Sequence, residues 1–292
     1  MNGLSKPLLT LLLCLTTAGV GFSLQYPSST AALTAEEIAD GIYIVRGGVA
    51  NTGFVVGDSE VLAIDAEMTA DQAKEMIAEI KKVTSKPLAK MVLTHSDGDH
   101  ISGLIGFPQG LDIISSVKAK EEMEAALKAS DSQALQPYLP TRTFSDKLDI
   151  DLAPEHIQLL HFGPAHTSGD AVVYFPAKKL AFVGDLVFVG RDPLIHRHKD
   201  GTASGLIKTL QALLQLDADR YVPGHGDIVS KSEIKAVLKN LQEKQTKIKS
   251  MIQDGKSLEE TKKAFGIADS SAKGGMRFPS LVETIYLELS AK

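Results

Sequence analysis

Four of the eight histidines and three aspartates of this sequence have the side-chain types and local settings of metal ligands. They lie in THSDGDH (residues 94–100), FGPAHTSGD, FVGDLVF and VPGHGD, and they are His95, Asp97, Asp99, His100, His166, Asp185 and His225. In each segment a polar residue stands beside glycine near the end of an apolar stretch, the position from which a rigid sheet presents side chains at its edge. Imidazole and carboxylate groups together suit Zn²⁺ or a neighbouring first-row metal.

The spacing within residues 94–100 indicates two metal positions. In an extended loop, His95 and Asp97 point the same way, whereas the adjacent Asp99 and His100 diverge toward a second position. Two ions about 3.5–4 Å apart can share a hydroxide that is a nucleophile at neutral pH. A lone histidine is more often structural, and HSDG could also begin a helix, because Ser96 and Asp97 are both good N-caps. The three later segments, in the same chain, favour the metal site.

These segments resemble the metallo-β-lactamase superfamily, whose signature is His-x-His-x-Asp-His after a strand, then a loop histidine, an aspartate and a late histidine. The segment ANTGFVVGDSEVLAID is similar to the opening strands of that family, in which the position of Asp65 is structural. The resemblance implies an α/β (α+β) fold, a four-layer αββα sandwich. It also implies a first metal held by His95, Asp97 and His166, and a second held by Asp99, His100 and His225, with Asp185 bridging the two.

One position departs from the family pattern, because Asp97 stands where the second histidine belongs. A carboxylate binds Zn²⁺ at about the same distance as imidazole does. It also adds one negative charge, which lowers the net charge of the metal-loaded site by one. The metal-bound water is therefore expected to be less acidic, and the preference is expected to shift from two Zn²⁺ ions toward Mn²⁺ or Fe²⁺.

The expected function is that of a metallo-hydrolase with two divalent ions. A bridging hydroxide, which Asp99 orients and deprotonates, attacks an ester, thioester, lactone or lactam-type bond of a small molecule. Three residues of the segment 191–202 are weaker candidates for binding a substrate anion, with a solvated basic loop as the alternative: His196, Arg197 and His198. The alternatives are an iron-dependent oxidoreductase resembling sulfur dioxygenases, and a metal-binding protein with a degenerate site.

The composition and the N-terminus bear on location and partners. The chain has 292 residues, 43% of them hydrophobic, and a formal charge of −5 without a run of like charge, so nothing attracts nucleic acid. Residues 1–23 have the layout of a signal peptide and contain the only cysteine, Cys14, which predicts export to the periplasm or medium. A membrane is a partner only if this segment stays as an anchor. Residues 24–34 are expected to be a leader and residues 35–292 a single catalytic domain.

Apolar periodicity predicts strands and helices that alternate along the domain. The expected strands lie near residues 41–47, 52–67, 90–94, 111–116, 157–162, 172–175, 180–183 and 221–222, and the expected helices near 69–83, 117–128, 206–214 and 233–252, with two short helices flanking 270–279.

Overall fold

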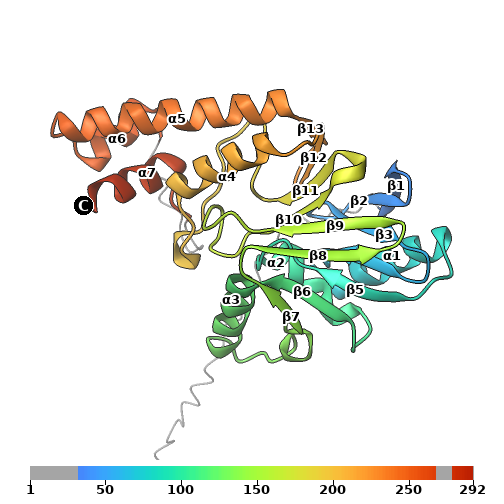
Figure 1. Cartoon of the computed structure of the whole chain (residues 1–292). Coiled ribbons are helices and arrows are strands. Elements are labelled where there is room, and N and C mark those ends of the chain that lie inside the picture. The colour runs from blue at the N-terminus through green and yellow to red at the C-terminus, as the bar shows by residue number, and fades with distance from the viewer. Residues whose placement is uncertain (1–31, 268–277, 292) are drawn as a thin grey trace, which may run out of the picture.

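The computed structural model describes residues 32–267 and 278–291, which form two β-sheets packed face to face between helices (Figure 1). The expected signal peptide and most of the leader lie outside these residues. The first sheet has the order β1 (Thr34–Ala39), β2 (Ile42–Arg46), β3 (Thr52–Val56), β4 (Val61–Ile64), β5 (Leu88–Val92), β6 (Asp112–Ser116), β7 (Arg142–Phe144). The second has the order β13 (Val229–Ser230), β12 (Arg220–Pro223), β11 (Leu180–Gly184), β10 (Val172–Phe175), β9 (Glu155–Leu160), β8 (Lys147–Leu152).

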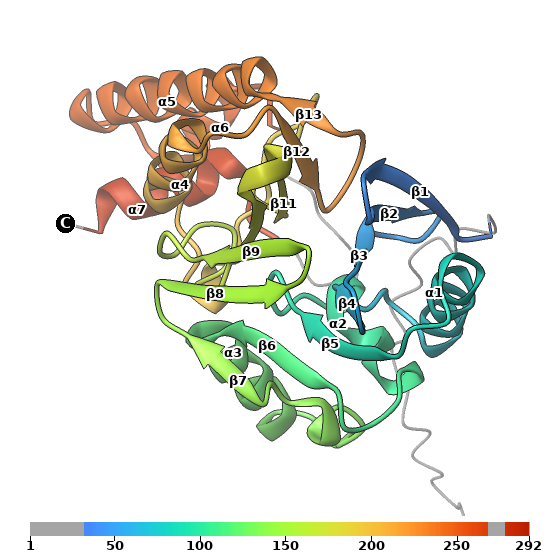
Figure 2. The ribbon, with the colours of Figure 1, turned by 45° about the vertical axis from the view of Figure 1, so that its right-hand side comes forward.

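The helices cover the two outer faces of this pair of sheets, on opposite sides of the molecule (Figure 2). They are α1 (Ala70–Val83), α2 (Gly98–Ile101), α3 (Val117–Lys128), α4 (Ala203–Gln215), α5 (Lys231–Gln253), α6 (Leu258–Ala264) and α7 (Leu281–Ser290). The first sheet packs against α1 and α3, and the second packs against α4, α5 and α7. The expected four-layer αββα sandwich is confirmed.

Both faces of each sheet are buried, and side chains that follow one another along a strand pack on opposite faces. In β3, Phe54 packs toward α1 while its neighbour Val55 packs into the layer between the sheets. Because successive strand residues point to opposite faces, a strand covered on both sides is apolar along its whole length. In β4 and β11 every residue is buried, so both strands lie in the interior.

The strand directions bring the ends of several strands to one edge of the sandwich. In the first sheet β4, β5 and β6 run parallel, so their C-terminal ends meet there, beside the start of the antiparallel β3. In the second sheet β11 and β12 run parallel, and the antiparallel β10 begins at the same edge. Loops that follow or precede these strands therefore converge on one place.

Most of the expected elements are confirmed, and α3 has the bounds predicted for it. Helix α1 begins after Thr69, whose side chain accepts a hydrogen bond from the Gln72 N–H, and it buries Ala73, Met76 and Ile80 at helical spacing. The sequence did not predict β1, β7, β8 or β13, which are edge strands or strands with mixed polar content. It also placed residues 98–101 in an extended loop, whereas they form the short helix α2.

β1 begins at Thr34, the last residue of the expected leader, and Leu33 before it is already buried. Within the described part of the chain, no helix combines the length and the apolar character that a membrane span requires.

Substituting Gly53 tests how closely the two sheets approach. A Cβ at Gly53 would lie 2.6 Å from the Phe182 ring and 2.7 Å from the Tyr43 carbonyl oxygen. We expect Gly53→Ala to lower the free energy of unfolding by about 1–3 kcal/mol, the usual cost of overpacking a core. Chemical denaturation measures it, and Gly53→Ala/Phe182→Leu should recover part of the loss. Equal stability of Gly53→Ala and the unmodified protein would contradict this packing.

Candidate metal centre

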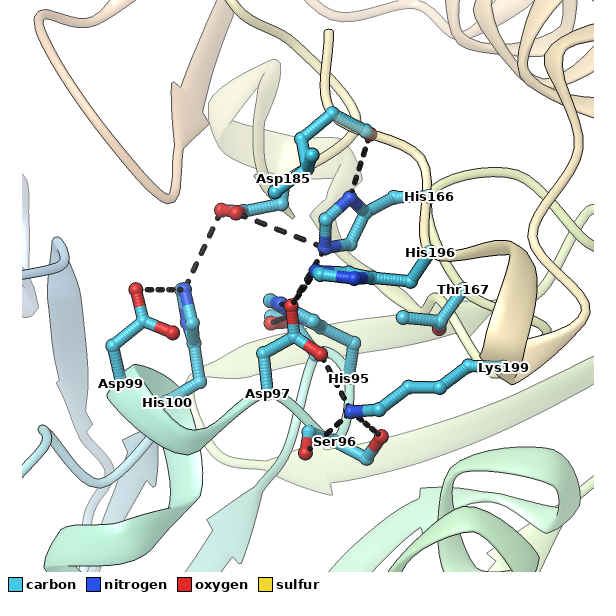
Figure 3. Close-up of polar contacts among 12 residues, drawn as sticks. His95, Ser96, Asp97, Asp99, His100, His166, Thr167, Asp185, His196 and Lys199 are labelled. Carbon is cyan, nitrogen blue, oxygen red and sulfur yellow. Dashed lines mark hydrogen bonds and ion pairs between the residues drawn. The ribbon is translucent and has the colours of Figure 1, made fainter. Parts of the chain in front are cut away.

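Seven metal-ligand candidates from both sheets meet at the shared edge of the sandwich, several of them shown with their polar contacts in Figure 3. The first sheet supplies the segment after β5, in which Asp97 is the last extended residue and α2 carries Asp99 and His100. The second sheet supplies His166 before β10, Asp185 after β11 and His225 after β12. All seven residues predicted from the sequence are therefore brought together.

The second predicted ligand set has the spacing of a metal site. The His225 Nε2 lies 3.2 Å from Asp99 Oδ2 and 3.3 Å from Asp185 Oδ2, and the His100 Nε2 lies 3.4 Å from Asp185 Oδ1. Ligands about 2.0–2.2 Å from a tetrahedral Zn²⁺ are separated by about 3.3 Å. These three distances match that geometry, whereas the His100 Nε2 and the Asp99 Oδ2 are 3.9 Å apart.

The first predicted set is less regular, because Asp97 already has close partners. Its Oδ2 lies 3.7 Å from the His95 Nε2 and 2.9 Å from the His166 Nε2. The second distance is that of a hydrogen bond, so the His166–Asp97 contact must open by a few tenths of an ångström to admit an ion. The Asp185 Oδ2 lies 3.8 Å from the His166 Nε2, which places Asp185 between the two sets as predicted.

Hydrogen bonds fix the orientation of the four ligand histidines. The Nδ1 of His166 donates to the Leu194 carbonyl at 2.9 Å, and the Nδ1 of His225 donates to the Val49 carbonyl at 3.0 Å. Asp65 accepts from the Nδ1 of His100 at 2.9 Å. A metal-binding imidazole usually donates its second N–H in this way, because the bond leaves the other nitrogen as a free donor to the ion.

The fourth histidine is held through a hydroxyl. Thr94 Oγ1 donates to Asp65 Oδ2 at 2.7 Å, so its lone pair accepts from the Nδ1 of His95 at 3.0 Å. Burial, together with the neighbouring His100, lowers the pKa of His95 to about 3, which keeps this ring neutral. All four imidazoles therefore direct Nε2 toward the centre of the site.

Buried polar atoms without a hydrogen-bond partner mark the same place. Among the described residues they include the Nε2 of His95, the Nε2 of His100 and the Oδ1 of Asp185. A buried polar group without a partner is costly, and native structures rarely leave several together. Divalent ions would satisfy all three atoms, so the donor set fits a metal centre.

The pKa values of the candidate ligands depend on one another, because histidines and aspartates lie in direct contact. Burial opposes the charged form of His166 and His225, but Asp97 raises the pKa of His166 to about 9, and Asp185 with Asp99 raises that of His225 to about 9. Burial would raise the pKa of Asp185, yet the neighbouring His100 and His225 rings hold it well below its usual value. The pKa of His100 is likewise raised well above its usual value, by Asp65 and Asp185. Without metal, these three candidate histidine ligands are therefore protonated at neutral pH.

Two glycines allow the ligands to approach so closely. A Cβ at Gly224 would lie 2.1 Å from Asp185 Oδ1 and 2.8 Å from the His100 ring. Gly184 has φ +50° and a Cβ there would lie 2.7 Å from Thr94 Oγ1. Gly184 precedes Asp185 and Gly224 precedes His225. Because glycine has no side chain, these positions leave room for Thr94 and His100 from the other sheet.

A lysine that the sequence did not single out is part of the site. Lys199, at the end of the short helix η4 (Arg197–Lys199), donates to Asp97 Oδ1 at 2.6 Å. It also donates to the carbonyl oxygen of Ser96 at 3.0 Å and to its hydroxyl at 2.9 Å. Glu122 of α3 accepts from the same hydroxyl. The sequence clue was Asp97 itself, because a buried carboxylate in place of histidine requires a counter-charge.

The three weaker candidates divide between site and surface. His196 is buried, and its Nε2 lies 2.8 Å from Asp97 Oδ2. Its ring has T-shaped contacts with His198 and Phe278, each at 5.0 Å. Arg197 and His198 are exposed. His196 therefore contacts the ligand candidate Asp97 and does not face solvent.

Ser96 and Thr167 follow the ligand candidates His95 and His166 directly in the sequence, but they contact other neighbours. Ser96 contacts Lys199 and Glu122, and Thr167 donates through its backbone and its hydroxyl to Asp170. Asp170 is buried, and its burial raises its pKa to about 7. These bonds close the loop that carries His166.

Comparisons with known proteins agree with this geometry. The family model described as "Metallo-beta-lactamase superfamily" matches residues 45–225. A solved metallo-beta-lactamase from Pontibacter korlensis has a TM-score of 0.61 at 23% identity and covers 72% of this chain and 99% of that chain. The metallo-beta-lactamase FIM-1 from Pseudomonas aeruginosa, in its mono-zinc form, has a TM-score of 0.60 at 17% identity, covering 74% and 97%.

Three curated relatives carry names of different enzymes. The alpha subunit of 2,4-dinitroanisole O-demethylase from Nocardioides sp. is 29% identical over 70% of this chain. A linear primary-alkylsulfatase from Pseudomonas sp. is 24% identical over 59%, and a metallo-beta-lactamase type 2 from Elizabethkingia meningoseptica is 25% identical over 48%. The matches span 61%, 40% and 53% of those relatives' own lengths.

Substituting Asp65 tests the hydrogen bonds behind the site. Asp65 accepts from the Thr94 N–H, the Thr94 hydroxyl and the His100 ring, and it has φ 59°, which asparagine tolerates. Asp65→Asn keeps the size but turns an –NH₂ group toward one of these donors. We expect metal affinity at the second position to fall about 10–100-fold, measured by competition with a chelating dye.

The matched control for Asp65→Asn is Glu67→Gln. Glu67 is also buried, has φ 64° and accepts from Thr52 instead of a metal ligand. We expect the Glu67→Gln variant to bind metal with the same affinity as the unmodified protein. Equal affinity of Asp65→Asn and this control would contradict the role assigned to Asp65.

The stability of the metal-free protein should depend on pH in a defined direction. The folded pKa values of His166 and His225, about 9, exceed the usual value near 6.5. Their stabilising contribution is therefore complete below about pH 6.5 and is lost as the pH rises through about 9. Chelator-treated protein should show a lower thermal midpoint at pH 9 than at pH 6.5, and the gain from added Zn²⁺ should grow over this range. A Zn²⁺-induced gain that shrinks with rising pH would contradict this assignment.

Proposed function

Because the chain belongs to the metallo-β-lactamase superfamily, we propose that it is a hydrolase that works with two divalent metal ions at the site described above. One observation carries the proposal. Four buried or half-buried imidazoles each donate Nδ1–H to a protein oxygen, which leaves four Nε2 atoms facing three carboxylates. The Nε2 atoms of His95 and His100 are buried without a hydrogen-bond partner, and those of His166 and His225 contact carboxylates of the same candidate ligand set. A purely structural cluster would pair all four nitrogens.

Two ions in this site would supply an activated water molecule and an electrophile for the oxygen of the bond that is cleaved. The protein residues supply position and proton transfer. Asp99 Oδ2 contacts His225 and His100, so we assign Asp99 Oδ1 to orient the attacking water and accept its proton. The Asp99 side chain is 17% exposed, so water can reach this carboxylate.

A cavity of about 390 Å³ lies between residues 188–193 and α5, and Phe188 connects it with the second ligand set, none of whose members lines it. Phe188 forms part of its wall, and the ring stacks on His225 with 6.0 Å between centroids. Val189, Pro193 and Val237 line the same cavity. We propose a small organic substrate whose apolar part contacts this wall and whose reacting bond is an ester, thioester, lactone or lactam.

Lys199 weakens the iron-dependent alternative. That alternative depended on the extra negative charge of Asp97, and Lys199 lies 2.6 Å from the Asp97 carboxylate. The ammonium offsets the charge that would favour a harder ion.

Metal content and substrate scope test the proposed function together. We expect the purified protein to hold two equivalents of Zn²⁺ and to hydrolyse at least one member of a panel of esters, thioesters, lactones and lactams. Because two relatives carry the names of an O-demethylase and an alkylsulfatase, the panel also includes an aryl methyl ether and an alkyl sulfate.

His100→Ala should remove one equivalent of metal and lower kcat/KM by more than about 100-fold, a usual effect of losing groups that stabilise the transition state. The matched control is His156→Ala, because His156 is a half-exposed histidine on β9 that pairs with Asp149 and Asp151. Protein that holds no metal would instead support a degenerate site. Oxygen uptake by the iron-loaded protein, without hydrolysis, would support the redox alternative.

A further inference from the structure

We propose that Asp97 and Lys199 act as one unit that replaces a histidine at the first metal position, with Lys199 as the positioning residue. The inference rests on the proposed function, because it assumes that His95, Asp97 and His166 hold an ion. It adds a residue outside the predicted ligand set and explains how a carboxylate serves in the place of an imidazole.

The lysine holds one of the two carboxylate oxygens. Its Nζ lies 2.6 Å from Asp97 Oδ1 and donates two further bonds to Ser96, so its three N–H groups are all used (Figure 3). An Oδ1 engaged by an ammonium at this distance is not available to a metal. The carboxylate can then offer only Oδ2, as imidazole offers only Nε2.

The second oxygen is oriented by a histidine. The His196 Nε2 lies 2.8 Å from Asp97 Oδ2, the atom that also faces His95 and His166. His196 occupies one lone pair of Oδ2, and the other becomes available to the ion when the His166–Asp97 contact opens. Both oxygens of Asp97 are therefore fixed before metal binds, which compensates for the shorter reach of aspartate.

The lysine is itself held in place by the loops around it. Its carbonyl oxygen accepts from the Ser168 N–H at 2.8 Å, and its N–H donates to the His196 carbonyl at 2.9 Å. Glu122 joins Ser96 to Ser168, whose hydroxyl donates to it at 2.6 Å. The Lys199 side chain is only 19% exposed, so the pair is shielded from most of the solvent. A side chain held in this way acts as a fixed part of the site.

The pair also restores the charge of the site. An aspartate in place of a neutral histidine adds one negative charge, and the ammonium adds one positive charge beside it. The Asp97–Lys199 unit is therefore neutral, as an imidazole would be. The expected shift toward Mn²⁺ or Fe²⁺ and a less acidic water need not follow from Asp97.

Three variants separate this unit from a simple surface ion pair. Lys199→Met keeps the length of the side chain but removes its charge and its N–H groups. Asp97→His introduces an imidazole while the ammonium remains nearby. Lys199→Met/Asp97→His combines both changes, and Lys239→Met, at an exposed position on α5, is the control.

Metal binding is read without relying on activity. Zn²⁺ stoichiometry and affinity are measured by titration calorimetry and elemental analysis, and the visible spectrum of Co²⁺-loaded protein reports the ligand set. We expect each single variant to bind the first ion at least about ten-fold more weakly, while the second ion is retained. The double variant should bind the first ion more tightly than either single variant and within a few-fold of the unmodified protein, with an altered Co²⁺ spectrum.

Two results would overturn the inference. One is unchanged two-metal binding by Lys199→Met, with the Co²⁺ spectrum of the control. The other is Asp97→His binding as tightly as the double variant, because the ammonium would then have no effect on an imidazole at position 97. If Lys199→Met does not fold, as judged by circular dichroism, the comparison of Asp97→His with the unmodified protein decides, and equal affinity of the two for the first ion would overturn the inference. Failure of the unmodified protein to bind two ions would count against the proposed function instead.

Discussion

The hydrogen bonds that Asp65 accepts from Thr94 and His100 are the interaction on which the metal centre depends. They join the end of β4 to the residues that follow β5, and through the Thr94 hydroxyl they also orient His95. One buried carboxylate therefore sets two imidazoles of different ligand sets. Its left-handed backbone conformation, φ 59°, is a local cost that the surrounding bonds offset.

This arrangement creates a site that is unfavourable without metal. Several nitrogens and carboxylate oxygens face one another in a buried space, and protons on His166 and His225 offset only part of the repulsion. Such a cluster lowers the stability of the metal-free protein, and it leaves polar atoms available to bind ions. The fold supports it from behind, because the supporting bonds come from backbone carbonyls and from residues of the sheets.

Local patterns in the sequence were sufficient to predict the alternating strands and helices and the seven ligand candidates, and the family resemblance implied the four layers. Apolar strands that end in a polar residue beside glycine are visible in short segments such as residues 94–100. Lys199 is 102 residues from Asp97, and Glu122 is 26 residues from Ser96. No local pattern links residues so distant, and only the packing of the loops brings them together. The helical turn at residues 98–101 was expected only as the alternative in which Ser96 or Asp97 begins a helix, and Asp97 is the N-cap of α2.

The close contact of Gly53 with Phe182 has a consequence for the chemistry of the site. Because His95, Asp97, Asp99 and His100 follow a strand of one sheet and His166, Asp185 and His225 come from the other, the thickness of the layer between the sheets fixes the separation of the ligands. Phe182 and the residues around it therefore act as a spacer for the metal centre. The metal preference of such a site can then change through substitutions in the apolar interior while every candidate ligand stays the same.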